Sequence, residues 1–190
     1  MLRNSNHHYG YIAQLLHWTV ALLIIGLIPM GWWMVGLDYY HGWYHRAPQL
    51  HKVLGMVALL LAAVRIGWAI IDRPPPLVAS LHPWERIAAS GAHHLLYLAT
   101  LAIPVTGYLI STSRGEGIDF YGWFEVPALL PEEKGREEWA GALHAYLAYG
   151  TAALVCAHAF AALKHQFIDR NGTLRRMLGR PADQPPTVSK

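Results

Sequence analysis

The sequence has few charged residues: Asp, Glu, Lys and Arg make up 14% of its 190 residues, whereas 54% are hydrophobic. An ordinary soluble domain carries about 25% charged residues, so both a water-soluble fold and a disordered chain are excluded. The excess of 15 basic over 12 acidic residues is too small to indicate a nucleic-acid partner. Most of the surface must therefore contact lipid, and the length suits one domain in a bilayer.

Cysteine is nearly absent, because Cys156 is the only one in the chain. A single cysteine excludes an intramolecular disulfide and a C-x-x-C-H haem attachment, so any haem is held without a covalent bond. The chain instead has 12 His, 8 Trp and 10 Tyr, and Trp and Tyr favour the membrane–water boundary. This composition indicates a histidine-rich membrane protein.

Four apolar runs are long enough to cross a membrane, since about 20 helical residues at about 1.5 Å each span the hydrocarbon core. They cover residues 12–35, 50–71, 88–110 and 140–163. The first run is too long for a signal-peptide core and is expected to be retained. Pro29 and Pro104 lie inside two runs, where neighbouring helices allow a kink. The predicted fold is all-α: an integral membrane four-helix bundle over residues 1–168, with a polar, disordered tail over 169–190.

The basic residues predict the orientation, because Lys and Arg near membrane ends stay on the cytoplasmic side. Nine lie on one side of the predicted bundle, in the N-terminal segment, the second connection and the tail. Four lie on the other side. Both termini are therefore expected to be cytoplasmic, and the connection between the third and fourth helices is expected on the outer side.

Four histidines lie deep in the predicted helices, where ionisable side chains are rare and usually bind something. His144 and His158 are 14 residues apart, which places them on one helix face about 21 Å apart along the axis. With cytoplasmic termini, His17 lies at the depth of His158, and His51 at the depth of His144. The sequence therefore predicts two histidine pairs stacked across the membrane.

Each pair suits a b-type haem, whose iron takes two axial imidazoles. Gly55, Ala148 and Thr151 are positioned to leave room for the macrocycle, and Arg65 is expected to pair with a haem propionate. A zinc ion is the alternative metal, but structural zinc needs about four ligands close together. Histidines that only form hydrogen bonds between helices are the alternative without a metal.

Histidines at the cytoplasmic boundary are the candidates for a quinone site. His165 lies seven residues after His158 on nearly the same face and could donate a hydrogen bond to a quinone carbonyl. A solvated interfacial histidine is the alternative interpretation. His93 and His94 begin the third helix, and one of them is expected to face the bundle and the other the lipid headgroups. His94 is the second quinone candidate.

Several motifs together resemble the bacterial cytochrome b561 family, over nearly the whole chain. They are Leu16-His17-Trp18, His51-Lys-Val-Leu-Gly55, Ile103-Pro104-Val-Thr-Gly107, the pair His144 and His158, and Asn171-Gly-Thr-Leu-Arg-Arg-Met177. The paired histidines are the most specific of these elements. The resemblance implies a multi-pass protein of the bacterial inner membrane. Its fold would be similar to the b subunits of nickel–iron hydrogenases and formate dehydrogenases, with four helices around two haems.

By this resemblance, His17 and His158 would ligate a cytoplasmic haem b, and His51 and His144 an outer one. Ubiquinone would accept electrons near His165. One member of the family is a superoxide oxidase, which passes electrons from periplasmic superoxide to ubiquinone. Basic residues near the outer haem would attract superoxide, and the candidates in this sequence are Arg46, Lys52, Lys134 and Arg136.

The outer connection has seven carboxylates and three basic residues, which would repel an anion unless the cations lie closer to the haem. The leading hypothesis is a quinone-linked electron-transfer protein, with superoxide as donor by resemblance. The alternative is a membrane subunit that takes electrons from a periplasmic redox protein docked on this acidic connection. A cofactor-free helical scaffold or transporter is the third hypothesis.

Overall fold

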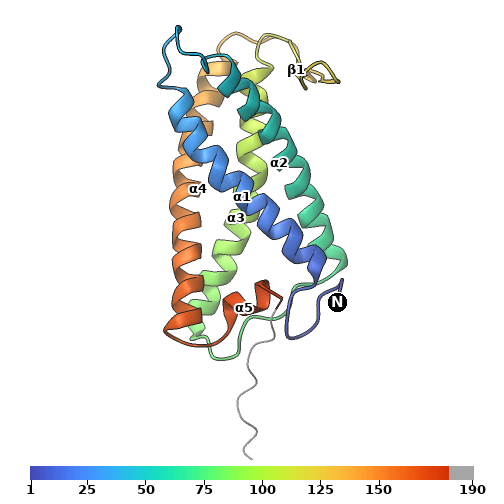
Figure 1. Ribbon diagram of the computed structural model, residues 1–190, viewed down its shortest axis with the longest axis vertical. Coiled ribbons are helices and arrows are strands. Elements are labelled where there is room, and N and C mark those ends of the chain that lie inside the picture. The colour runs from blue at the N-terminus through green and yellow to red at the C-terminus, as the bar shows by residue number, and fades with distance from the viewer. Residues whose placement is uncertain (180–190) are drawn as a thin grey trace, which may run out of the picture.

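The computed structural model describes residues 1–179, and four long helices make up most of this part of the chain (Figure 1). They are α1 (Tyr11–Met34), α2 (Arg46–Ile71), α3 (Pro83–Ser111) and α4 (Arg136–Phe167). Each is long and apolar enough to cross a membrane. The predicted all-α membrane bundle is confirmed, and the helices continue through Pro29 and Pro104.

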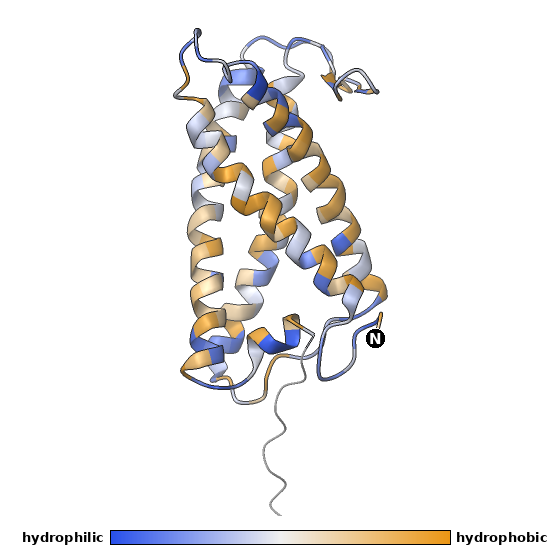
Figure 2. Cartoon of the chain, in the orientation of Figure 1, coloured by the Kyte–Doolittle hydropathy of each residue, from blue (hydrophilic) through white to orange (hydrophobic). Residues whose placement is uncertain are grey.

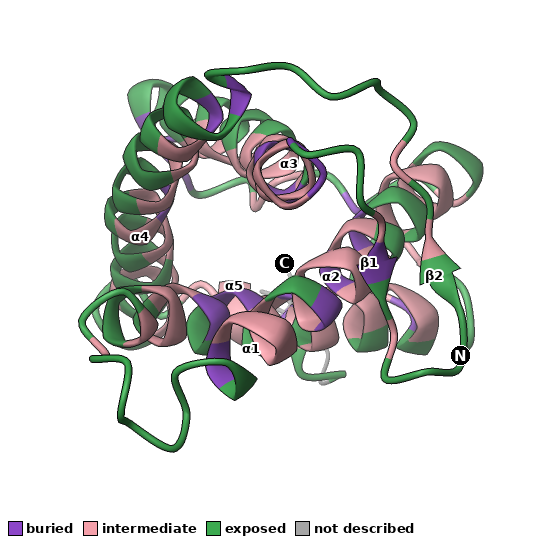
Figure 3. Cartoon of the chain, turned by 90° about the horizontal axis from the view of Figure 1, so that it is seen from above, coloured by how far each residue is buried: buried purple, intermediate pink, exposed green. Residues whose placement is uncertain are grey.

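The four helices lie around a ring in chain order when the bundle is viewed along its axis (Figure 3). α1 packs on α2, α2 on α3, and α3 on α4. Between α1 and α4 the rings of Trp32 and Tyr149 stack with their centroids 5.6 Å apart. The N-terminus and the short helix α5 (Thr173–Met177) lie at what we term the inner end. The hairpin of β1 (Ile118–Asp119) and β2 (Glu125–Val126) lies at the opposite, outer end (Figure 1).

Large apolar side chains cover the outside of the bundle. Leu15, Leu22, Ile25 and Leu60 are each more than half exposed. Figure 2 shows hydrophobic residues along the helices, with most hydrophilic residues gathered toward the two ends. Water would solvate such a surface poorly, whereas lipid acyl chains solvate it well, and intrahelical hydrogen bonds satisfy the backbone. The apolar side chains around the bundle thus fit a protein that spans the bilayer.

Three of the four helices are longer than the apolar runs that predicted them, whereas α1 has the same length as its run. α2 begins four residues before the run 50–71 and α3 five residues before the run 88–110, while α4 extends four residues beyond the run 140–163 at each end. A hydropathy run measures the segment inside hydrocarbon, but helical hydrogen bonding continues through the headgroup region. At the start of α3, Pro83 follows the N-cap and the Glu85 carboxylate accepts a hydrogen bond from the His82 backbone N–H at 3.0 Å.

Part of the predicted C-terminal tail belongs to the folded structure. The Arg176 side chain of α5 is buried and donates to the carbonyl oxygens of His7 at 2.8 Å and Pro76 at 3.0 Å. These bonds join α5 to the N-terminal segment and to the connection after α2. The fold therefore continues past the predicted boundary at 168, and residues 180–190 of that tail lie outside the described residues.

Arg136 closes the outer end of the bundle. Its side chain is 2% exposed and donates to the Glu133 carboxylate at 3.1 Å and to the Thr112 carbonyl oxygen at 3.5 Å. The guanidinium thereby links the end of α3, the outer connection and the start of α4. The structure does not place this predicted anion-attracting residue on the outer surface.

We expect Arg136→Ala to lower the melting temperature of the detergent-solubilised protein by about 5 °C. Losing roughly 2 kcal/mol of buried hydrogen bonding shifts the midpoint of a domain of this size by about that amount. The control is Lys134→Ala, because Lys134 is exposed on the same connection. Equal melting temperatures for the two variants would show that the buried guanidinium does not stabilise the outer end.

Candidate functional site

At the inner end, His17 of α1 and His158 of α4 lie next to each other. Their ring centroids are 6.4 Å apart and their planes are inclined at 58°. Two imidazoles that bind one metal ion from opposite sides have centroids about 6 Å apart, since each metal–nitrogen bond is about 2 Å and each half-ring adds about 1 Å. The separation of the two rings matches that arrangement.

Nearer the outer end, His51 of α2 and His144 of α4 form the second pair, with ring centroids 6.2 Å apart. His144 Nδ1 lies 3.0 Å from the Ile103 carbonyl oxygen. A carbonyl oxygen only accepts, so Nδ1 carries the hydrogen and Nε2 keeps the lone pair that a metal needs. The structure thus brings together both histidine pairs that the sequence predicted.

Glycines on α1 and α3 allow the outer pair of rings to approach these helices closely. A Cβ atom added at Gly107 would lie 3.2 Å from His144 Cε1, and one added at Gly31 would lie 3.3 Å from His51 Cε1. Both distances are tighter than ordinary van der Waals contact. Sequence reasoning missed Gly31 and quoted Gly107 only as part of a motif.

On every long helix, the residue at the inner level and the residue at the outer level are 14 positions apart in the sequence. This spacing could have identified the two glycines from the sequence. An interval of 14 residues returns to nearly the same helix face about 21 Å further along. The interval separates His17 from Gly31, His51 from Arg65, His93 from Gly107, and His144 from His158. Each of these residues belongs to one of the two histidine levels.

The inner level also contains a third histidine and an arginine. The His93 ring lies 5.4 Å from the His158 ring. Arg65 Nη2 donates to His17 Nδ1 at 3.2 Å, and the guanidinium lies 4.8 Å above the Tyr97 ring. Arg65 is therefore at the inner level, as predicted. His93 is the one of the two adjacent histidines that faces the bundle.

Two further observations indicate that the residues of the outer level fit a haem. Within residues 1–179, His51 Nδ1 is buried without a hydrogen-bond partner, so this nitrogen is not committed to a protein hydrogen bond. Apart from its chain neighbours and the backbone of its own helix, Gly55 has no heavy atom within 4 Å of the position that a Cβ atom would take. Thr151, on α4 between His144 and His158, is 3% exposed. Free imidazole nitrogen and open space beside a glycine suit a flat, iron-containing macrocycle.

The N-terminal segment and α5 cover the Arg65 side of the inner level. A small cavity of about 30 Å³ is bordered by side chains that include Tyr9, His17, Arg65 and Met177. Trp18 Nε1 donates to the Met177 carbonyl oxygen at 3.1 Å and holds α5 over this region. Burial raises the pKa of the Tyr9 hydroxyl, and the positive charge of Arg176 opposes that shift. The Tyr9 hydroxyl is therefore neutral in this cover.

Among the predicted anion-attracting residues, Lys52 is the one beside a histidine pair. It follows His51 in the sequence, is exposed, and borders an outer cavity of about 830 Å³ together with Tyr44 and His45. Lys134 and Arg46 are also exposed, whereas Arg136 is buried. The outer end thus has an exposed cation one residue along α2 from His51.

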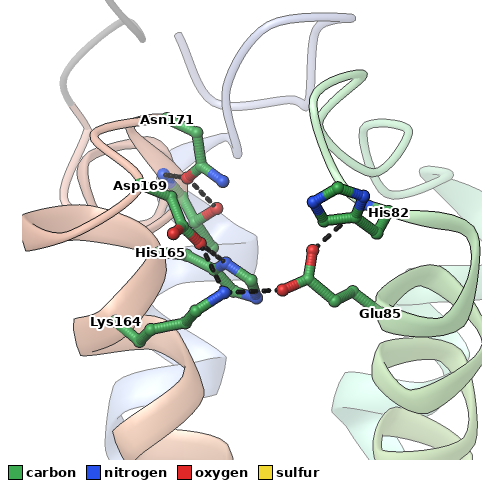
Figure 4. A network of polar contacts seen from close by, with 7 residues as sticks. His82, Glu85, Lys164, His165, Asp169 and Asn171 are labelled. Atoms are coloured by element: carbon green, nitrogen blue, oxygen red, sulfur yellow. Dashed lines mark hydrogen bonds and ion pairs between the residues drawn. The ribbon is translucent and has the colours of Figure 1, made fainter.

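The two predicted quinone candidates have different surroundings. His94 is exposed and its Nδ1 bonds to the Ser90 carbonyl oxygen of its own helix at 2.7 Å. His165 is 12% exposed and its Nδ1 lies 2.6 Å from the Asp169 carboxylate (Figure 4). Only His165 belongs to a network that joins two helices.

A family model described as prokaryotic cytochrome b561 matches residues 8–180. The chain is 45% identical to cytochrome b561 homolog 2 of Escherichia coli (strain K12), over 93% of this chain and 94% of that protein. It is 30% identical to cytochrome b561 homolog 1 of the same strain, over 87% of this chain and 93% of that protein. It is also 29% identical to a probable superoxide oxidase CybB of Yersinia pestis, over 90% of this chain and 95% of that protein. These similarities extend over the whole bundle.

We expect Gly107→Val to reduce the bound haem b to about half of the wild-type amount, because the new side chain would displace the His144 ring from its place beside His51. The control is Gly26→Val, since nothing lies within 4 Å of the Cβ position at Gly26. Absorbance of haem per purified chain measures the difference. If Gly107→Val bound as much haem as the wild-type protein, haem binding would not depend on the close approach of His144 to α3.

Proposed function

Because this chain belongs to the prokaryotic cytochrome b561 family and is a membrane electron-transfer protein, we propose that it conducts electrons through two b-type haems from a donor at its outer end to a quinone at its inner end. A bound haem supplies a reversible one-electron iron couple, while the protein supplies ligands, charge and orientation. The observation that carries the proposal is the pairing of imidazoles from different helices at two levels.

In this proposal His51 and His144 hold the outer haem, and His17 and His158 hold the inner one. The two levels are about 21 Å apart along α4. Arg65, whose Nη2 lies 3.2 Å from His17 Nδ1, is the cation that would pair with an inner haem propionate in place of the His17 ring. These residues keep both cofactors inside one helical bundle, away from water.

The inner end faces the cytoplasm in this proposal, and the protein spans the bacterial inner membrane. The N-terminal segment, the connection between α2 and α3, and α5 lie together at that end (Figure 1). These segments and the first turn of α3 contribute basic residues that include Arg3, Arg73, Arg86 and Arg175. This distribution supports cytoplasmic termini by the positive-inside rule.

Superoxide is the proposed outer donor, on the similarity to the protein named probable superoxide oxidase. Lys52 supports it, because an exposed ammonium beside His51 attracts an anion toward the outer level. A periplasmic redox protein is the second candidate donor, and the acidic outer connection favours it. There Arg136 is buried and Arg114 pairs with Glu137 at 3.7 Å, which leaves the remaining exposed carboxylates to present a negative surface.

We expect His144→Ala and His158→Ala each to remove one of two low-spin b haems, because each substitution deletes one axial ligand. His94→Ala is the matched control, since His94 is exposed and bonds within its own helix. Haem stoichiometry and the optical spectrum of each purified variant measure the effect. Two haems retained in His158→Ala would refute the proposed pairing, provided that the variant elutes as a single folded species.

We expect Lys52→Gln to slow haem reduction by superoxide about fivefold at low salt, because one nearby unit charge is worth about 1 kcal/mol in water. Lys134→Gln is the control at an exposed lysine of the acidic connection. Stopped-flow absorbance of the haem band measures both rates. A wild-type protein that superoxide does not reduce, but that a periplasmic redox protein does, would favour the second donor.

A further inference from the structure

The hairpin of β1 and β2 projects sideways from the outer end of the bundle. Figure 3 shows it outside the ring of helices, beside α2, and Figure 1 shows it near the outer end of that helix. Ile118 of β1 is buried, so the base of the hairpin packs against the protein. The Gln49 side chain donates a hydrogen bond to the Asp119 carbonyl oxygen. The hairpin is therefore attached to the first turn of α2.

This attachment sets the depth of the hairpin relative to the membrane. Gln49 directly precedes the apolar run 50–71, where the part of α2 that spans hydrocarbon begins. The hairpin backbone bonded to Gln49 thus lies at the boundary between hydrocarbon and headgroups. The turn of the hairpin comes two to three residues after Asp119, roughly 7 to 10 Å further along the strand. It therefore reaches past α2, above the lipid that surrounds the bundle.

The two faces of the hairpin carry opposite chemistry. Successive strand residues alternate between faces, and residues paired across two strands share one face. Asp119 pairs with Glu125, so these two exposed carboxylates lie on the same face. Phe120 and Phe124 follow on the opposite face, which also carries the buried Ile118, and their rings stack with centroids 4.3 Å apart. The hairpin is therefore amphipathic, with one acidic face and one apolar face.

The aromatic side chains at the tip of the hairpin contact little of the protein. Trp123 is 90% exposed, and Tyr121 and Phe124 are each more than half exposed. Three large apolar side chains that lie close together in water carry an unfavourable hydration free energy. Trp and Tyr are the side chains that gather at the membrane–water boundary, because each combines an apolar ring with a polar atom.

The backbone of the turn forms its hydrogen bonds within the hairpin. The N–H of Phe120 donates to the Phe124 carbonyl oxygen at 2.8 Å, and that of Trp123 to the Phe120 carbonyl oxygen at 3.2 Å. The N–H of Gly122 donates to the Asp119 carboxylate at 2.9 Å. Peptide groups that are already hydrogen-bonded lose little free energy when they leave water. The turn is thus suited to partial burial among lipid headgroups.

We propose that this hairpin lies on the outer leaflet of the membrane, with its aromatic tip among the headgroups and its acidic face in water. Zwitterionic headgroups are the partner that fits, because Asp119 and Glu125 beside the tip repel anionic lipids. This position holds the first part of the acidic outer connection beside α2, away from the centre of the bundle. The proposal depends on the membrane-spanning bundle and not on the electron donor or acceptor.

The test is the accessibility of a nitroxide label at position 121 in full-length, haem-loaded protein in phosphatidylcholine liposomes. Cys156 is the only native cysteine, so a Cys156→Ser background allows Tyr121→Cys to be labelled while Trp123 is kept. Labels on Leu60→Cys and Lys134→Cys are the lipid and water controls, since Leu60 is exposed on α2 and Lys134 on the outer connection.

We expect the label at position 121 to collide with a water-soluble nickel complex about threefold less often than the label at position 134, because headgroups shield it. Its collisions with oxygen, which concentrates in lipid, should lie between those of the two controls. Haem absorbance equal to that of the wild-type protein shows that each labelled chain is folded, since the hairpin is remote from both histidine levels.

A second variant tests whether the aromatic tip is responsible. We expect Trp123→Glu to raise nickel collisions at position 121 to the level at position 134, because a carboxylate keeps the tip in water. Leu129→Glu is the matched control, since Leu129 is an exposed apolar residue of the same connection outside the hairpin, and it should change nothing.

Three results would overturn the proposal. The first is equal nickel access at positions 121 and 134 when Trp123 is present. The second is protection from both nickel and oxygen, which would mean that a second copy of the chain or another protein covers the tip. The third is a label whose accessibility does not respond to Trp123→Glu.

Discussion

The close approach of imidazole rings from different helices, at two depths, is the contact on which the arrangement of this bundle depends. α4 contributes a histidine to each level, so α1 must meet it at the inner level and α2 at the outer level. Helices whose outer surfaces are apolar gain no hydrophobic driving force for association inside a bilayer. The ring contacts join α1 to α4 and α2 to α4, in addition to the packing of α1 on α2, α2 on α3 and α3 on α4.

The two levels are built from different neighbours, although the same interval of 14 residues generates both. At the outer level, Gly31 and Gly107 contribute no side chain, and the histidine rings pack directly on the helices. At the inner level, the equivalent positions on the neighbouring helices carry Arg65 and His93. The inner level is consequently more polar and has a fixed positive charge, which fits the proposed direction of electron transfer toward the inner end.

The two ends of the bundle, beyond the two histidine levels, carry different charged residues. At the outer end, Lys52 is exposed beside a histidine, while Arg136 is withdrawn into the structure and leaves acidic residues on the surface. At the inner end, Arg176 ties α5 to two other segments, and Lys164 holds two carboxylates together. An exposed lysine among acidic residues at one end and a network of ionisable groups at the other are consistent with the proposed passage of electrons from an outer donor to an inner quinone.

The sequence by itself determined the four helices and the histidine pairs, because apolar length and helical periodicity are local properties. His144 and His158 share a face whatever surrounds them, and the assumed membrane orientation was enough to select their partners. Hydropathy made α2, α3 and α4 too short, because the turns at their ends are polar. The choice between His93 and His94, the burial of Arg136 and the bond between Lys164 and Glu85 depended on which helices meet. These three features were decided only by the tertiary structure, because they depend on contacts between segments that are distant in the chain.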